Sequence, residues 1–220
     1  MKVKICGLTD VLEAQAAAEA GADYLGLVFA PSRRQISPVK AKEITRAIKQ
    51  MNLQSSEDRP QVVGVFVNLP VDEVNTLAEF CDLDWVQISG DEPWGYCQEI
   101  EKPIIKAIHV SPSGTAYDVL KKIEEGHRSN SGQKLICLLD TQVKESYGGT
   151  GLTFKWQLAK EIAEVFPVFV AGGLTPVNLH QLILEAHPWG VDVSSGVETE
   201  GKKDIEKIRD FMRAARQMKP

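Results

Sequence analysis

Two side chains whose chemistry suits proton transfer each stand at the end of an apolar segment. Cys6 ends the segment Val3–Cys6, and Asp140 directly follows the apolar run Leu135–Leu139. A thiolate can remove a proton from carbon, and a carboxyl group whose pKa is raised by burial can serve as a general acid. Each residue also has a plainer interpretation, since buried cysteine is usually inert and a lone aspartate can cap a helix or pair with a cation. Together, a base and an acid suit an isomerisation.

Two short loops offer groups that could hold an anion. Gly172 and Gly173 follow one apolar segment, and Ser194, Ser195 and Gly196 follow the next. Glycine has no side chain, so backbone N–H groups can approach a ligand closely, and serine hydroxyls add further donors. Either sequence alone is also typical of an ordinary tight turn. Because the two occur together after the last two apolar segments, they indicate a phosphate-binding site.

Arg34 is a candidate for the recognition of a carboxylate. Its planar guanidinium group can bind a substrate carboxylate through two parallel hydrogen bonds. Arg33 directly precedes it, and the alternative interpretation is that both arginines are solvated surface charges.

These residues need a scaffold that brings the ends of distant segments together. Strands are predicted at Val3–Cys6, Tyr24–Phe29, Val62–Val67, Trp85–Ile88, Ile104–Ile108, Leu135–Leu139, Val168–Ala171 and Val191–Val193. Helices are predicted near Leu12–Ala20, from Pro38 with Ser37 as its N-cap, and near Val71–Phe80, Pro93–Glu101, Ala116–Glu125, Trp156–Val165, Pro176–Ala186 and Asp204–Met218. This alternation of eight strands with eight helices implies parallel strands joined by helical crossovers.

The count of eight favours an α/β protein built as a single (β/α)₈ TIM barrel. A doubly wound open sheet is the competing architecture, but it normally shows a G-x-G-x-x-G loop after its first strand, which is absent here. In a barrel, reactive residues stand at the carboxyl ends of the strands. Cys6, Arg34, Asp140 and the two loops would therefore converge on one rim. The sequence has no low-complexity linker, so we expect one catalytic domain over residues 1–220.

Composition excludes several other classes of protein. The net charge of -5 argues against general nucleic-acid binding, which needs a basic surface. The four cysteines contain no C-x-x-C pair, so neither a zinc site nor a disulfide framework is predicted. No apolar run approaches the ~20 residues of a membrane span, and no signal sequence precedes the first strand. We therefore expect a cytoplasmic protein without a nucleic-acid or membrane partner.

An ordered set of short motifs extends along nearly the whole chain. In the first half these motifs are Lys4-Ile5-Cys6-Gly7-Leu8-Thr9, Ser32-Arg33-Arg34-Gln35-Ile36-Ser37, Gly64-Val65-Phe66-Val67-Asn68 and Val86-Gln87-Ile88-Ser89-Gly90-Asp91-Glu92-Pro93. In the second half they are Leu138-Leu139-Asp140, Gly148-Gly149-Thr150-Gly151, Ala171-Gly172-Gly173-Leu174, Val191-Asp192-Val193-Ser194-Ser195-Gly196-Val197-Glu198 and Gly201-Lys202-Lys203-Asp204. Each motif is modest alone, but the ordered set is specific, and it resembles the phosphoribosylanthranilate isomerases of tryptophan biosynthesis.

The resemblance implies an Amadori rearrangement of a phosphorylated small molecule. N-(5-phosphoribosyl)anthranilate would become 1-(2-carboxyphenylamino)-1-deoxyribulose 5-phosphate. By family analogy, Asp140 is the general acid that protonates the ribose ring oxygen, and Cys6 is the general base that removes the C2′ proton. Arg34 would hold the anthranilate carboxylate. No cofactor or metal is implied, because the substrate nitrogen serves as the electron sink, and association with other tryptophan-pathway enzymes is open.

Some positions depart from the family pattern. Leu152 stands where lysine is common, Lys155 stands where aspartate is usual, and Ser89 stands where many relatives carry histidine. The first two belong to the polar stretch 141–155, which is predicted to be a loop on the active rim. Gln87 and Asp192 match the pattern, and either ligand contact or buried hydrogen bonding would explain them.

Two alternatives stay open at this point. A related barrel isomerase of histidine biosynthesis performs the same rearrangement but, as a family, has aspartate at the position of Cys6. A non-catalytic phosphate-binding barrel could keep the fold without the activity, although the Cys6–Asp140 pair argues against it.

Overall fold

The computed structural model describes residues 1–52, 59–110, 114–140 and 150–217, with the backbone alone for 150–155. Its strands close into one barrel in the order β1 to β8, and neighbouring strands run parallel throughout. The strands are β1 Lys2–Cys6, β2 Tyr24–Val28, β3 Gln61–Phe66, β4 Trp85–Ile88, β5 Ile104–His109, β6 Leu135–Asp140, β7 Val168–Ala171 and β8 Gly190–Val193. The predicted (β/α)₈ TIM barrel is confirmed.

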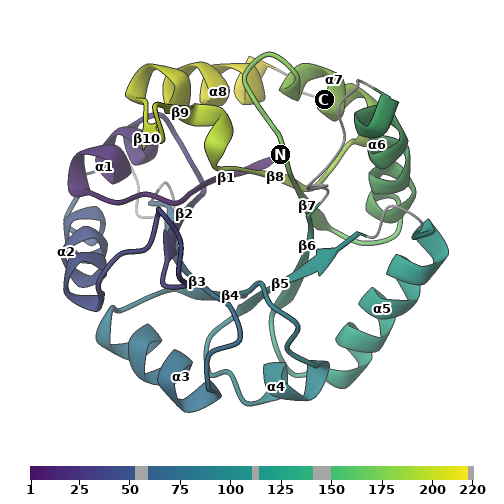
Figure 1. The fold of residues 1–220 in the computed structure, drawn as a ribbon, viewed down its shortest axis with the longest axis horizontal. Helices are drawn as coiled ribbons and strands as arrows, with labels where there is room; N and C mark the ends of the chain where they lie inside the picture. The colour runs from purple at the N-terminus through teal and green to yellow at the C-terminus, as the bar shows by residue number, and fades with distance from the viewer. Residues whose placement is uncertain (53–58, 111–113, 141–149, 218–220) are drawn as a thin grey trace.

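The helices form a ring outside this barrel (Figure 1). They are α1 Val11–Glu19, α2 Pro38–Lys49, α3 Val71–Phe80, α4 Trp94–Gln98, α5 Ala116–Ser129, α6 Thr150–Ala163, α7 Leu179–Ala186 and α8 Ile205–Gln217. The strands are almost entirely buried because their outer faces pack against this ring and their inner faces pack against one another. None of the helices in the described part of the chain combines the length and apolar character needed to cross a membrane.

Aromatic side chains fill the amino-terminal end of the barrel interior. Tyr24 makes edge-to-face contacts with Trp85 and Phe169, with ring centroids 5.8 and 5.4 Å apart. Phe169 also meets Trp189 edge-on at 5.0 Å. A side chain at Gly190 would collide with the Phe169 ring, so glycine at the start of β8 makes room for this packing. Because aromatic side chains fill the amino-terminal end of the barrel, the open rim is at the carboxyl ends of the strands.

Local sequence signals account for most helix boundaries. The predicted N-cap Ser37 accepts a hydrogen bond from the Lys40 backbone N–H at 3.2 Å, and Pro38 occupies the first helical turn. Thr115 and Asp118 form a capping box at the start of α5. These contacts satisfy backbone donors that have no partner inside the helix.

Four predicted helices were wrong at their ends, and one of them is α5, which ends at Ser129 and not at Glu125. Helix α6 begins at Thr150, so the predicted loop over 141–155 is helical in its last part, while residues 141–149 lie outside the described residues. Helix α7 begins at Leu179 because Asn178 instead bonds the Thr175 N–H and the Gly173 carbonyl, a turn that competes with a helix. Helix α4 is shorter than predicted at both ends.

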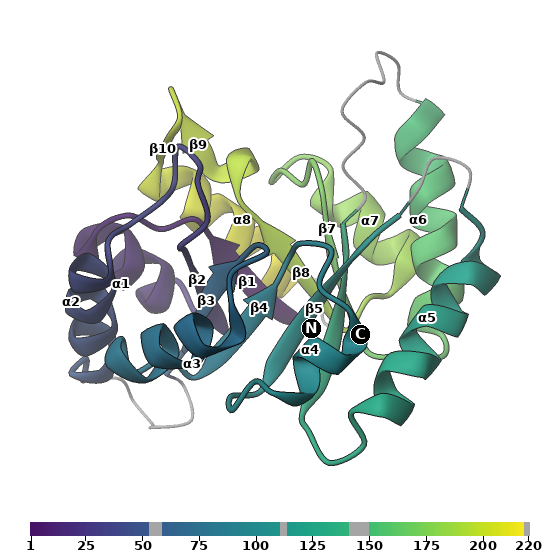
Figure 2. The same cartoon turned by 60° about the horizontal axis from the view of Figure 1, so that its bottom comes forward.

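A small structure above the rim was not predicted. A 3₁₀ turn, η2 Ser195–Val197, leads into a two-stranded hairpin of β9 Glu198–Thr199 and β10 Lys202–Lys203. Glu200 and Gly201 form its turn, and both have positive φ, as the favoured two-residue hairpin turn requires. In Figure 2 the hairpin stands above the carboxyl ends of the strands, beside β1 and β2.

Candidate active site

A pocket opens at the carboxyl ends of strands β4 to β8. Among the predicted site residues, its lining includes Asp140, Gly172, Gly173, Ser194 and Ser195. Cys6, Arg34 and Gly196 do not line it, although all three belong to the same rim. The pocket walls also include Gln87, Ser89, His109 and Asp192.

Cys6 is buried at the carboxyl end of β1. It stands in register with Gly26 of β2, and a Cβ at Gly26 would lie only 2.8 Å from the Cys6 sulfur. Glycine at this position therefore makes the space that the thiol occupies. Burial raises the pKa of the Cys6 thiol and the nearby Lys4 ammonium lowers it, with the net shift upward.

A buried ion pair lies directly below Cys6. Lys4 Nζ donates to Asp192 Oδ1 at 3.0 Å, and the Lys4 side chain is fully buried. The two residues are in register on the neighbouring strands β1 and β8. Asp192 links the pocket to the buried ion pair, because its side chain lines the pocket and also binds Lys4.

Asp140 ends β6 and faces an imidazole from β5. His109 Nδ1 lies 3.6 Å from Asp140 Oδ2, while His109 Nε2 lies 2.9 Å from the Ser89 carbonyl oxygen. A carbonyl oxygen only accepts, so Nε2 must carry a hydrogen, and Nδ1 is the atom turned towards Asp140. Both side chains are partly exposed, 53% for His109 and 32% for Asp140. Asp140 is thus more open to solvent than the sequence led us to expect.

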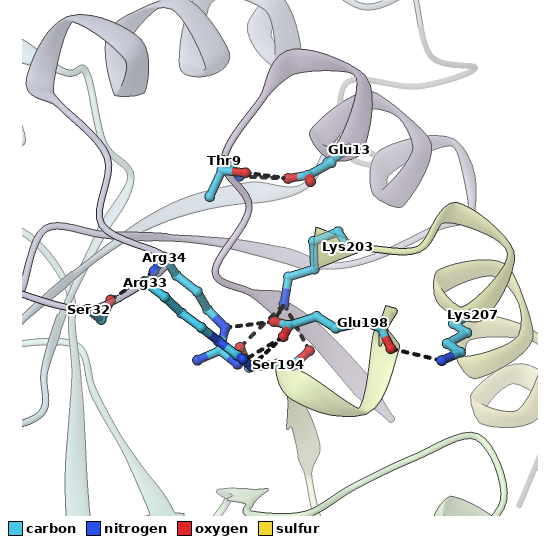
Figure 3. Close-up of polar contacts among 9 residues, drawn as sticks. All are labelled: Thr9, Glu13, Ser32, Arg33, Arg34, Ser194, Glu198, Lys203 and Lys207. Atoms are coloured by element: carbon cyan, nitrogen blue, oxygen red, sulfur yellow. Dashed lines mark hydrogen bonds and ion pairs between the residues drawn. The ribbon is translucent and has the colours of Figure 1, made fainter. Parts of the chain in front are cut away.

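Arg34 is held in place by Glu198 of the rim hairpin (Figure 3). Its Nε donates to Glu198 Oε1 at 2.6 Å, and its Nη2 donates to Glu198 Oε2 at 3.1 Å. The side chain runs over Gly7, the residue after Cys6, where any Cβ would collide with it. The alternative interpretation of Arg34 as a solvated charge is wrong, because 23% of its side chain is exposed and its Nε edge is paired.

Three cations converge on this one carboxylate. Besides Arg34, Arg33 Nη2 lies 2.6 Å and Lys203 Nζ lies 2.8 Å from Glu198. Burial would raise the pKa of Glu198, but hydrogen bonds from Arg34 and Lys203 outweigh it and lower the pKa to about 2. Lys203 also donates to the Ser194 carbonyl at 2.8 Å. The cluster carries more positive than negative charge, which suits an anionic ligand.

The two predicted phosphate loops differ in detail. Gly172 and Gly173 both have positive φ, and a Cβ at Gly173 would meet nothing within 4 Å, so the backbone there is open. A Cβ at Gly196 would instead collide with the Leu174 carbonyl. Gly196 therefore lets η2 pack closely on the loop after β7, whereas Ser195 lines the pocket.

Gln87 lines the pocket, and one atom of its side-chain amide lacks a hydrogen-bond partner among the described residues. Its Nε2 donates to Ser89 Oγ at 2.9 Å, while its buried Oε1 has no hydrogen-bond partner among the described residues. A buried acceptor without a partner costs free energy, and a ligand hydroxyl in the pocket would provide one. This geometry favours ligand contact over the purely structural interpretation of Gln87.

Sequence reasoning missed Lys4, His109, Glu198 and Lys203. The sequence did contain a signal for Lys4. It is a charged residue inside an apolar strand, and because it precedes Cys6 by two positions, the two side chains lie on the same face of that strand. His109 ends its strand as Asp140 does. Glu198 and Lys203 gave no such signal, since their roles depend on a contact with Arg34 across most of the chain.

The chain matches known proteins over nearly its whole length. The family model described as N-(5′-phosphoribosyl)anthranilate (PRA) isomerase matches residues 3–214. An N-(5′-phosphoribosyl)anthranilate isomerase from Dehalococcoides mccartyi is 47% identical over 212 residues, which cover 96% of this chain and 94% of that protein. A multifunctional tryptophan biosynthesis protein from Phycomyces blakesleeanus is 36% identical across 98% of this chain, and the match spans 33% of that protein.

Solved structures agree with this result. Phosphoribosyl anthranilate isomerase from Thermotoga maritima matches with a TM-score of 0.79 and 34% identity, over 99% of this chain and 100% of that one. A solved isomerase in complex with reduced 1-(o-carboxyphenylamino)-1-deoxyribulose 5-phosphate matches with a TM-score of 0.76 and 33% identity, over the same shares. With an eight-stranded barrel, a pocket on its rim and these matches along the sequence, the chain belongs to the N-(5′-phosphoribosyl)anthranilate isomerase family.

Proposed function

We propose that residues 1–220 form one catalytic barrel that rearranges N-(5-phosphoribosyl)anthranilate to 1-(2-carboxyphenylamino)-1-deoxyribulose 5-phosphate, with Asp140 as the general acid and Cys6 as the general base. The observation that carries the proposal is the placement of these two groups on one rim. Asp140 faces the pocket at the end of β6, and Cys6 ends β1 beside Asp192, which lines the same pocket. A sugar between them can exchange protons with both.

The reaction proceeds in two proton transfers and a tautomerisation. Asp140 gives its proton to the ribose ring oxygen, the C1′–O bond breaks, and the nitrogen lone pair forms a protonated Schiff base. The Cys6 thiolate then takes the C2′ proton, and the released electron pair forms a C1′–C2′ double bond while the nitrogen becomes neutral. The resulting enolamine loses its O2′ proton and gains one at C1′ to give the ketone. General acid–base catalysis of this kind typically contributes about 10²–10⁴-fold in rate.

The two ends of the substrate carry negative charges, and we assign each to a separate part of the rim. The phosphate binds the open backbone at Gly172 and Gly173 together with Ser194 and Ser195, and Gly196 keeps the second loop packed. The anthranilate carboxylate binds Arg34. Glu198 occupies the Nε edge of that guanidinium group, so the Nη1 end is the part that meets the ligand. Gln87 Oε1 accepts a hydrogen bond from a sugar hydroxyl.

The setting of the enzyme also belongs to the proposal. Cys6, Cys81, Cys97 and Cys137 are all free thiols, which supports a reducing cytoplasmic location. The match to one part of a multifunctional tryptophan biosynthesis protein supports association with other enzymes of that pathway.

Turnover of purified protein tests the reaction assignment. N-(5-phosphoribosyl)anthranilate is fluorescent through its anthranilate group, and we expect its fluorescence to fall when the protein is added. The matching control is the phosphoribosyl formimino carboxamide of histidine biosynthesis, which we expect to be left unchanged. Turnover of that compound alone would identify the histidine-pathway isomerase, and binding of both compounds without turnover would identify a non-catalytic barrel.

A further inference from the structure

The Lys4–Asp192 pair is unusual for its surroundings inside the barrel. The neighbouring inner side chains are aromatic or aliphatic, among them Tyr24, Phe169 and Leu138. The Lys4 side chain is fully buried and that of Asp192 is 9% exposed, with 3.0 Å between Nζ and Oδ1. The register of β1 with β8 places the two residues directly side by side.

Stability gives a poor reason for this pair. Moving two charges out of water costs several kcal/mol per ion, and replacing a buried pair by well-packed apolar residues is often neutral or stabilising. The barrel has such packing immediately below, in its aromatic layer. A role for the ammonium group in the chemistry above it accounts for its position better.

Cys6 lies where it would feel that ammonium group. It follows Lys4 by two residues on β1, so both side chains project to the barrel interior. The charged groups that act on the sulfur are Lys4 on the same strand, Asp192 on β8 and Lys203 on β10. Lys4 is the cation that opposes burial most strongly in setting the pKa of Cys6, both by its charge and by a hydrogen bond. The Asp192 carboxylate acts in the opposite direction.

The pKa of Lys4 supports a permanent charge at this place. Burial alone would lower it, but Asp192 and Cys6 outweigh burial, and the net shift is upward. The Asp192 carboxylate therefore favours the charged form of Lys4 despite its burial. An ammonium group that is fixed by Asp192 cannot turn away from the sulfur to reach water.

We propose that Lys4, held by Asp192, is a positioning residue that stabilises the Cys6 thiolate and so prepares the base for the C2′ proton. This inference rests on the proposed role of Cys6. The thiol releases its proton to water before the reaction, the ammonium group stabilises the remaining negative charge, and the proton taken from C2′ leaves by the same route after turnover. Asp192 limits the effect, since its own charge opposes the thiolate.

The test is a titration of Cys6 that needs no catalysis. The ultraviolet absorbance of the thiolate is followed against pH in the parent protein and in Lys4→Met, and each curve is corrected by subtracting the same background carrying Cys6→Ser. We expect Lys4→Met to move the Cys6 midpoint up by about one unit or more, the usual effect of losing an opposite charge at short range. The double variant Lys4→Met/Asp192→Asn leaves no unpaired charge, and we expect a smaller shift in the same direction.

A second buried pair supplies the matched control. Lys106 Nζ lies 3.0 Å from Glu92 Oε2, and both side chains are buried, but Lys106 is not among the main influences on the pKa of Cys6. We expect Lys106→Met/Glu92→Gln to leave the Cys6 midpoint in place. If the Lys4 variants fold and their Cys6 midpoint does not rise, or if the control shifts it equally, the inference is overturned.

Turnover then separates this inference from the proposed function. With Cys6 as the base, Lys4→Met lowers kcat at neutral pH and leaves KM nearly unchanged, and higher pH restores part of the loss. If the Cys6 midpoint rises in Lys4→Met but Cys6→Ser turns over normally, Lys4 stabilises the thiolate and Cys6 is not the base. If Cys6→Ser loses activity but the Cys6 midpoint does not move in Lys4→Met, Cys6 remains the proposed base and the role of Lys4 is rejected.

Discussion

The two groups that we propose for proton transfer, Cys6 and Asp140, lie in opposite kinds of surroundings. Cys6 is buried against Gly26 of β2 and lies beside the Lys4–Asp192 pair. Asp140 opens onto the pocket, and its neighbour His109 is half-exposed. A thiol must lose its proton to become a base, and fixed charge in a dry site acts strongly on it. An acid must recover a proton after each turnover, and contact with solvent helps it do so.

The comparison also explains how each group is held. The base side is fixed by strand register, because Lys4, Cys6, Gly26 and Asp192 all lie on β1, β2 or β8. On the acid side, Asp140 stands at the end of β6, and its neighbour His109 contacts the Ser89 carbonyl oxygen. We therefore expect changes on the base side to cost more than changes beside the acid.

Cys6→Ser should have the largest effect. The change in volume is small, so the barrel should fold, but an alcohol is a far weaker proton acceptor than a thiolate near neutral pH. We expect kcat to fall by up to about 10⁴-fold. Turnover is measured on purified protein whose circular dichroism matches the parent, and near-parental kcat would remove Cys6 from the mechanism.

Asp140→Asn should have the second-largest effect on kcat. Its amide cannot donate a proton as an acid does, but the substrate nitrogen assists ring opening, so some reaction continues without it. We expect kcat to fall by about 10²–10³-fold, with little change in stability because the site is partly exposed. A loss confined to KM would instead show that Asp140 binds substrate and does not protonate it.

Arg34→Ala should weaken binding of ligands that carry the anthranilate carboxylate. A charge-assisted hydrogen bond contributes roughly 1.5–3 kcal/mol, or about ten- to a hundredfold in affinity. Arg34→Lys should restore only part of it, because an ammonium group lacks the planar fork. Glu198→Gln should give a smaller loss, since it keeps the acceptor but not the charge that fixes Arg34.

A double-mutant cycle decides this point. Affinities are compared for product analogues with and without the carboxylate, in the parent protein and in Arg34→Ala. A coupling energy close to zero would mean that Arg34 does not contact the carboxylate, whatever the variant does to turnover.

His109→Ala should have the smallest effect. A half-exposed pair contributes about 1 kcal/mol or less, so we expect kcat to fall by about two- to fivefold. Added imidazole should restore part of the rate if the ring assists Asp140 directly. His180→Ala, on α7 and away from the pocket, is the control. A loss as large as that of Asp140→Asn would contradict the view that the acid side depends little on its neighbours.

The sequence predicted much of the scaffold, and the position of several candidate site residues on it, for a simple reason. Apolar runs buried on both faces mark the strands of a parallel barrel, and the polar residues that end them must lie on one rim. That argument placed Asp140 correctly and found the glycines after β7. It could not reveal the partners of Arg34, because Glu198 meets it only after the hairpin folds over the rim.

Local competition explains the errors in the helices. Thr150–Lys155 carries few apolar positions, so its polar sequence resembled a loop although it begins α6. Asn178 and Thr175 form a turn through hydrogen bonds of their side chains, so α7 begins later in the sequence than predicted. In both cases the sequence pattern was weak at a helix end, where neighbouring contacts decide the boundary.

The central claim is that one substrate spans the rim with its carbon skeleton between the enclosed base and the open acid. A crystal structure of this protein with reduced 1-(o-carboxyphenylamino)-1-deoxyribulose 5-phosphate tests it most directly. The account predicts the Cys6 sulfur at about 3–3.5 Å from C2′, the carboxylate on Arg34, and the phosphate beside Gly173 and Ser195. An analogue bound in the pocket with its phosphate at Arg34, or with C2′ turned away from Cys6, would contradict it.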